Sequence, residues 1–168
     1  MKKLFILTVI TFIGYAGYGQ KFENQILKTL DYMTSNANND NVIEKMKLIG
    51  LNLKSENKDK EGNRLVDFEV PNGKLSFFYS GSKKLIYIRI DLPKVNAKIL
   101  IPLMEELKKN EFKRTNTRTN TFTEEPMTVE FRNPSYPYIF IFYDIYELNY
   151  SVYAFNYEFG SLEDYELK

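Results

Sequence analysis

Apolar residues recur at helical spacing in three stretches of the chain. The first stripe has intervals of four, four and three residues and consists of Phe22, Ile26, Leu30 and Met33. Such a stripe is typical of an amphipathic helix that packs against a core. A second helix is expected between Asn41, which has capping-box spacing to Glu44, and Gly50, which favours a left-handed helix end. A third is expected over 100–107, with Pro102 either in its first turn or at a kink.

Apolar and polar residues alternate through most of the remaining chain, which is the pattern of strands. The clearest runs are 66–70, 75–80, 86–91, 127–132, 138–143 and 150–158. In the third run, Ile86, Ile88 and Ile90 are expected to face the core. The run 115–121 has no apolar face, so we expect an exposed edge strand or a hairpin arm there.

The short loops between these runs favour antiparallel neighbours, because a parallel connection needs a long crossover. A sheet with one apolar face also needs a helical cover. We therefore expect an α+β fold. It should be an antiparallel sheet of about seven or eight strands in meander order, with two to three helices packed on one face.

The two halves of the chain follow the same order of elements. At an offset of 63 residues, Val66 corresponds to Val129, Phe68 to Phe131 and Pro71 to Pro134. This correspondence predicts a tandem duplication of a helix-plus-meander unit, over about 20–92 and 93–159. The alternative is that two similar strand-turn-strand units arose independently. In either case, two such units can share one continuous sheet.

This tandem order resembles that of the secreted β-lactamase inhibitor proteins. Each half is similar to the single unit of small outer-membrane assembly lipoproteins. The resemblance covers the order of elements alone. The disulfides of the inhibitors and the acylated cysteine of the lipoproteins have no counterpart in a chain without cysteine, so no functional residue is carried over.

The first nineteen residues have the layout of a secretory signal peptide. Lys2 and Lys3 precede an apolar run over 4–13, and small residues at Gly17 and Gly19 precede Gln20. A membrane span would need about 20 apolar residues. We expect 1–19 to be removed. The mature chain 20–168 is then a soluble single domain that does not span the membrane and ends in a short acidic tail at 160–168. It is expected in the periplasm or outside the cell.

Charge and composition exclude several function classes. The chain has 23 Lys and Arg against 22 Asp and Glu, and loss of Lys2 and Lys3 leaves 21 against 22, a net charge of −1. That balance argues against a nucleic-acid partner. The absence of His and Cys excludes Ser-His-Asp catalysis, a thiol nucleophile and the usual zinc ligands, so neither a metal site nor a cofactor is expected. A carboxylate-based hydrolase, with Asp144 and Glu147, remains one alternative.

Aromatic residues are the unusual feature of the composition. The chain has 13 Tyr and 13 Phe, and 11 of these 26 fall in the hairpin 136–159. In its second strand, one face carries Tyr153, Phe155, Tyr157 and Phe159 and is too apolar to be left in water. One interpretation is a core filled by large rings.

The functional interpretation gives some of these tyrosines a binding role. The candidates for a platform that contacts a sugar, a peptide or a partner protein are Tyr136, Tyr138, Tyr146 and Tyr150. The leading hypothesis is an exported, non-enzymatic binding module whose partner is a protein or an envelope component. The main alternative is a carrier of small apolar ligands, with a pocket between helices and sheet lined by Phe77, Phe140 and Phe142.

Overall fold

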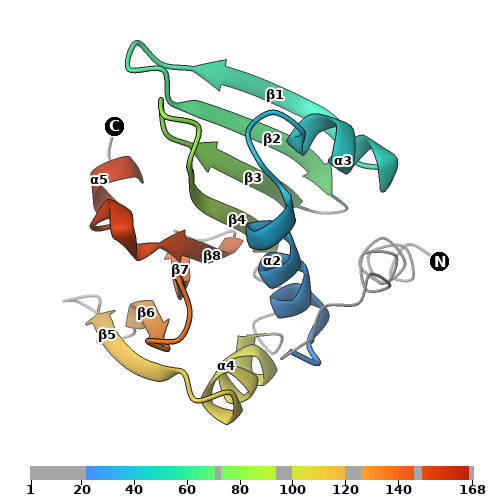
Figure 1. Cartoon of the computed structure of the whole chain (residues 1–168). Coiled ribbons are helices and arrows are strands. Elements are labelled where there is room, and N and C mark those ends of the chain that lie inside the picture. Colours follow the sequence, from blue (N-terminus) through green and yellow to red (C-terminus); the bar gives the residue numbers. More distant parts are fainter. Residues whose placement is uncertain (1–21, 71–72, 94–99, 120–125, 146–148, 167–168) are drawn as a thin grey trace.

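The computed structural model describes residues 22–70, 73–93, 100–119, 126–145 and 149–166 (Figure 1). The predicted signal peptide lies outside these ranges. No helix within them is long and apolar enough to cross a membrane. The helices are α2 (Gln25–Asn36), α3 (Val42–Leu48), α4 (Leu100–Lys109), the 3-10 turn η3 (Tyr157–Phe159) and α5 (Glu163–Glu166).

The strands form one antiparallel sheet in the order β1-β2-β3-β4-β8-β7-β6-β5. They are β1 (Asn52–Lys58), β2 (Arg64–Val70), β3 (Gly73–Tyr79), β4 (Leu85–Pro93), β5 (Lys113–Thr119), β6 (Pro126–Arg132), β7 (Tyr138–Ile145) and β8 (Asn149–Asn156). This confirms the predicted α+β class and the largely meander order. It also confirms an edge strand in the polar run 115–121, whose described part, up to Thr119, belongs to β5.

Each half contributes four consecutive strands, and the two sets join where β4 pairs with β8. The corresponding residues Val66 and Val129, and Phe68 and Phe131, are all buried in the same core cluster. The order is the one expected when two similar units share a sheet. The duplication itself stays a prediction.

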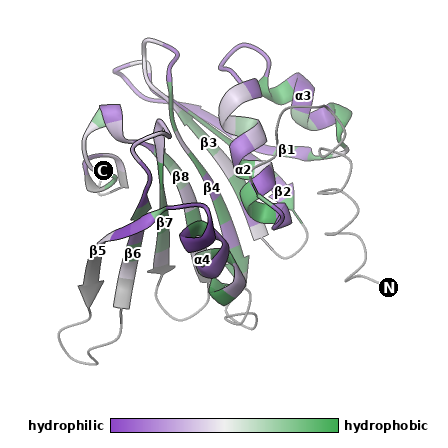
Figure 2. Ribbon diagram, turned by 60° about the horizontal axis from the view of Figure 1, so that its bottom comes forward, coloured by the Kyte–Doolittle hydropathy of each residue, from purple (hydrophilic) through white to green (hydrophobic). Residues whose placement is uncertain are grey.

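The first face of the sheet is covered by helices. Figure 2 shows α2, α3 and α4 on this face, and α2 contacts β4 and β8 while α3 contacts β1. The helices bury apolar stripes that include Leu27, Leu30, Leu103 and Leu107, each with no exposed surface. Burial of one Leu side chain stabilises the fold by about 1.5–3 kcal/mol. This apolar contact is what fixes the helices on the sheet.

The second face of the sheet is partly covered by the end of the chain. Leu162 is buried there, and Tyr165 makes edge-to-face contact with Phe78 at 5.9 Å between ring centroids. Tyr153 and Phe155 are both fully buried in this cluster. The central strands are therefore apolar on both sides, as the bulky run 138–143 predicts.

Three local predictions are wrong. Ile86 lies on the second face with Tyr87, because a register shift between β3 and β4 inserts an extra residue at that point. The last predicted strand ends at Asn156, whose side chain accepts a hydrogen bond from the Glu158 amide and starts η3. Asn41 makes no side-chain cap for α3; its Oδ1 accepts a hydrogen bond from the Asn38 amide. Gly50, in contrast, has the predicted positive φ, 84°.

Candidate functional site

The tyrosines predicted as a platform lie at two ends of the β7–β8 hairpin. Tyr138 pairs with Asn156 at one end, and Tyr150 pairs with Asp144 near the other. Six residues of strand, at about 3.4 Å each, separate them by about 20 Å. The hairpin therefore does not bring Tyr138 and Tyr150 into one contact surface.

Tyr136 lies near Tyr138, is partly buried and packs against the core on the helical face. Its ring centroid is 5.0 Å from that of Phe112 and 6.1 Å from that of Phe22. Burial raises the pKa of its hydroxyl to about 12, and the charge of Asp31 adds to this effect. Tyr146 lies outside the described residues. Of the tyrosines predicted to bind a ligand or partner, Tyr138 is the one that we follow further, because a depression in the surface lies beside it.

A depression of about 350 Å³ opens beside Tyr138, and we call it the polar depression. It lies where the end of α2 and the α2–α3 loop meet the β3–β4 turn and the adjoining ends of β7 and β8. Its lining consists of Thr34, Ser35, Asn36, Ala37, Asn38, Tyr79, Lys83, Lys84, Leu85, Tyr138, Asn156 and Glu158. Its volume is at the lower end of the range for small-ligand pockets, about 300–1,000 Å³.

Tyr79 lies at the floor of the polar depression, at the end of β3. Its side chain is fully buried and its ring stacks on Phe77 with an interplanar angle of 5°. Its hydroxyl has no hydrogen-bond partner among the described residues. Burial raises the pKa of this hydroxyl, although the positive charge of Arg64 opposes the shift. The group is therefore a neutral phenol at physiological pH, able both to donate and to accept.

Tyr138 forms the adjacent wall, and its hydroxyl is already engaged. It donates a hydrogen bond of 3.3 Å to the backbone oxygen of Thr34 in the last turn of α2. Burial and the nearby charge of Glu158 both raise the pKa of Tyr138. The bond ties β7 to α2, so Tyr138 shapes the depression while Tyr79 leaves an unused polar group in it.

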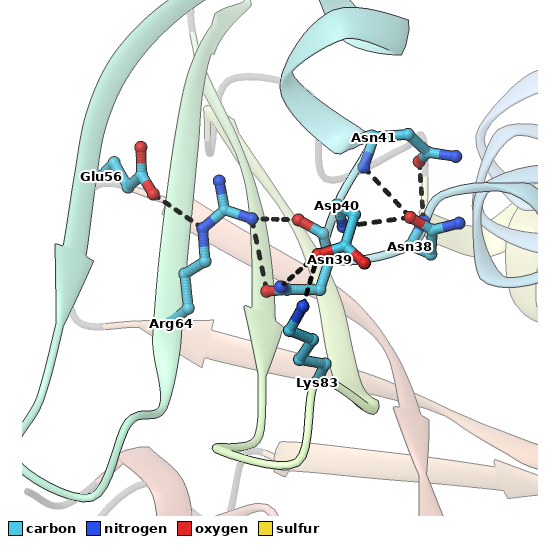
Figure 3. A network of polar contacts seen from close by, with 7 residues as sticks. All are labelled: Asn38, Asn39, Asp40, Asn41, Glu56, Arg64 and Lys83. Carbon is cyan, nitrogen blue, oxygen red and sulfur yellow. Dashed lines mark hydrogen bonds and ion pairs between the residues drawn. The ribbon is translucent and has the colours of Figure 1, made fainter.

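The loop between α2 and α3 forms the upper wall and is held by polar contacts (Figure 3). Asn38 Oδ1 accepts hydrogen bonds from the amides of Asp40 and Asn41, both at 3.0 Å. Arg64 of β2 donates to the backbone oxygen of Asn39, and Lys83 Nζ lies 2.9 Å from Asp40 Oδ1. This last contact holds the pKa of Asp40 below its usual value. The loop is thereby fastened to strand β2 and to the β3–β4 turn.

Two further charged side chains line the polar depression. Lys84 follows Lys83 in the β3–β4 turn, and Glu158 lies in η3 directly after β8. Both are exposed. Neither side chain makes an ion pair or hydrogen bond with another residue in the described part of the chain. The depression therefore has one uncommitted charge of each sign at its rim.

A second polar group lies on the opposite face of the sheet, and we call it the outer charged cluster: Asp67, Lys74, Arg89 and Asp91. Lys74 Nζ is 3.6 Å from Asp67 Oδ2 and 4.0 Å from Asp91 Oδ2, and Arg89 Nε is 3.3 Å from Asp91 Oδ1. Serine hydroxyls also donate to both carboxylates. Each carboxylate thus lies near a cation and accepts a serine hydrogen bond, while Asp67 Oδ1 is buried with no described partner. The cluster pairs opposite charges of the neighbouring strands β2, β3 and β4 on this face.

The residues predicted for an apolar-ligand carrier and for a carboxylate-based hydrolase form no shared site in the described part of the chain. Phe77, Phe140 and Phe142 are buried and pack edge to face on other rings. A separate, largely apolar pocket of about 240 Å³ lies between α2 and α3 and is lined in part by Met33 and Leu48. Glu147 lies outside the described residues. Within those ranges, no group of three or more Asp or Glu side chains is placed to hold a metal ion.

Sequence reasoning missed Tyr79, because its place in the alternating run with Phe77 indicates a core residue. The run does not show that the hydroxyl reaches the edge of the core. The chain matches no protein-family model, and it has no significant match among curated proteins or solved structures. Function is therefore inferred from the site itself.

Proposed function

We propose that the protein is an exported, non-enzymatic binding module and that the polar depression is where its ligand binds. The observation that carries this proposal is the Tyr79 hydroxyl, which is buried at the floor of the depression without a described partner. A buried hydroxyl without a hydrogen bond costs about 1–3 kcal/mol. A ligand that supplies the bond recovers this cost on binding.

The surroundings of Tyr79 support binding and offer no catalytic machinery. The loop over the depression is fastened by Arg64 and Lys83, so this wall of the site is preformed. Burial holds the hydroxyl of Tyr79 in its protonated form, and the sequence has no histidine or cysteine that could activate it. Export is supported by the signal-like layout of the first nineteen residues.

Ligand capture followed by mass spectrometry tests the proposal. The purified protein is incubated with small molecules extracted from the envelope fraction, washed and unfolded, and the released compounds are identified. The same capture is repeated with Tyr79→Phe and with Tyr143→Phe. Tyr143 is a matched control, because it lies on the same sheet but on its second face. We expect a compound retained by the wild type and Tyr143→Phe and reduced with Tyr79→Phe. Equal retention by all three proteins would exclude the depression as the site.

A carrier of small apolar ligands is the second candidate, and the pocket between α2 and α3 favours it. That pocket is mostly apolar, and the side chain of Leu48 beside it is 79% exposed. The capture experiment separates the two functions. An apolar compound that is lost with Met46→Gln, and retained with Tyr79→Phe, would identify the helix pocket as the binding site.

A further inference from the structure

The two uncommitted charges of the polar depression lie on neighbouring strand ends. The pairing of β4 with β8 sets Tyr87 opposite Phe155 and Ile88 opposite Ala154. Lys84 directly precedes β4 and Glu158 lies in η3 directly after β8, and both line the depression. They are of opposite sign, yet no ion pair joins them.

The other charges near the depression are already paired. Lys83 is engaged by Asp40 at 2.9 Å, and Arg64 is engaged by Glu56 at 2.8 Å. A ligand therefore meets Lys84 as the available cation and Glu158 as the available anion among the described lining residues. A ligand with one charge would be attracted by one of them and repelled by the other.

A ligand that carries both a positive and a negative charge would also meet neutral polar groups in the depression. The Tyr79 hydroxyl at the floor offers a donor to a carboxylate. The last turn of α2 forms one wall, but its backbone oxygens are already engaged, that of Thr34 by the Tyr138 hydroxyl and that of Asn36 by Lys45, so Glu158 is the group left for an ammonium ion. Lys84 and Glu158 are exposed, whereas the Tyr79 side chain has no exposed surface, so a ligand reaches its hydroxyl only when the side chains that line the depression move apart.

We propose that the polar depression selects small zwitterions of the amino-acid type. Lys84 and the Tyr79 hydroxyl bind the carboxylate, and Glu158 binds the ammonium group. This inference rests on the proposed function, because it names the class of ligand for the same depression. No covalent bond is made or broken, and selectivity arises from the two rim charges of opposite sign.

A titration followed by amide NMR signals tests the inference with four probes: L-serine, acetate, methylammonium and glycerol. We expect L-serine to shift the signals of residues 79–85 and 156–158 and to bind more tightly than the other three. Lys84→Gln and Glu158→Gln should each weaken L-serine binding about twofold to fivefold, the range for exposed charge pairs. Lys60→Gln and Glu105→Gln, which remove exposed charges outside the depression, should leave it unchanged.

The outcomes separate this inference from the proposed function. If acetate or glycerol binds as tightly as L-serine, and Tyr79→Phe weakens that binding, the depression is a ligand site and the zwitterion assignment is wrong. If Lys84→Gln and Glu158→Gln have no more effect than their controls, the assignment is also wrong. If no probe shifts these signals, both the assignment and the depression as a site for small polar ligands are refuted.

Discussion

Replacement of Tyr79 by Phe should stabilise the protein, which is an unusual result for a fully buried residue. The change removes one oxygen atom and keeps the ring that stacks on Phe77. The wild-type hydroxyl is buried without a described partner, at a cost of about 1–3 kcal/mol. Loss of the oxygen also loses van der Waals contacts worth about 0.1–0.2 kcal/mol each. We expect a net gain of about 0.5–2 kcal/mol in the free energy of unfolding.

Tyr138→Phe is the matched comparison, because the chemical change is the same and the expected sign is opposite. Its hydroxyl donates to the Thr34 backbone oxygen, and loss of that bond should cost about 0.5–1.5 kcal/mol. Denaturant unfolding at pH 7 measures both variants. The denaturant slope should not change, since neither variant alters the surface exposed on unfolding.

One result would refute the reasoning. If Tyr79→Phe loses as much stability as Tyr138→Phe, the Tyr79 hydroxyl has a partner in the folded protein. The depression would then contain no buried polar group without a partner, and the main support for ligand binding would be lost. If Tyr79→Phe is more stable but captures less ligand, the wild type retains a destabilising group for the sake of binding.

Four other outcomes are expected. Burial raises the pKa of Tyr136 to about 12, so the contribution of its protonated hydroxyl to stability is complete below pH 10 and is lost as pH rises through 12. The free energy of unfolding should therefore be lower at pH 11.5 than at pH 9, and Tyr136→Phe should reduce this difference. Leu162→Ala should cost about 2 kcal/mol in denaturant unfolding, because this side chain covers the second face of the sheet. Gly73→Ala should cost about 1–3 kcal/mol, since the new methyl group would collide with the Asp91 backbone oxygen; an unchanged unfolding midpoint would contradict this contact. Intact-mass measurement of the exported protein should give a chain that starts at Gln20.

The sequence determined the elements whose causes are local. Alternation in 66–70 and 75–80 gave strands β2 and β3, because successive strand residues point to opposite faces. Gly50 ended a helix because it tolerates a positive φ. The polar run that begins at Thr115 became part of edge strand β5, since it has no apolar side chains to bury on either face. These features need no knowledge of distant contacts.

Tertiary structure decided what depends on register and on partners far along the chain. One inserted residue opposite Tyr79 moved Ile86 to the second face, and alternation alone does not locate such a bulge. The element that buries each face of the aromatic hairpin could be identified only in the complete sheet, because helices cover one side and the C-terminal turn covers part of the other. Tyr138 lines the polar depression, and Tyr136 packs against the core.

The polar depression depended most on tertiary structure. Tyr79 ends β3, Tyr138 begins β7 and Glu158 lies in η3, so these lining residues are separated by up to 79 positions in the sequence. Composition determined that no histidine or cysteine would be among them. Which hydroxyl finds a partner depends on where α2 ends against the sheet, and hydrophobic packing between elements sets that position. For this reason the sequence predicted the fold, and the folded chain was needed to identify the site.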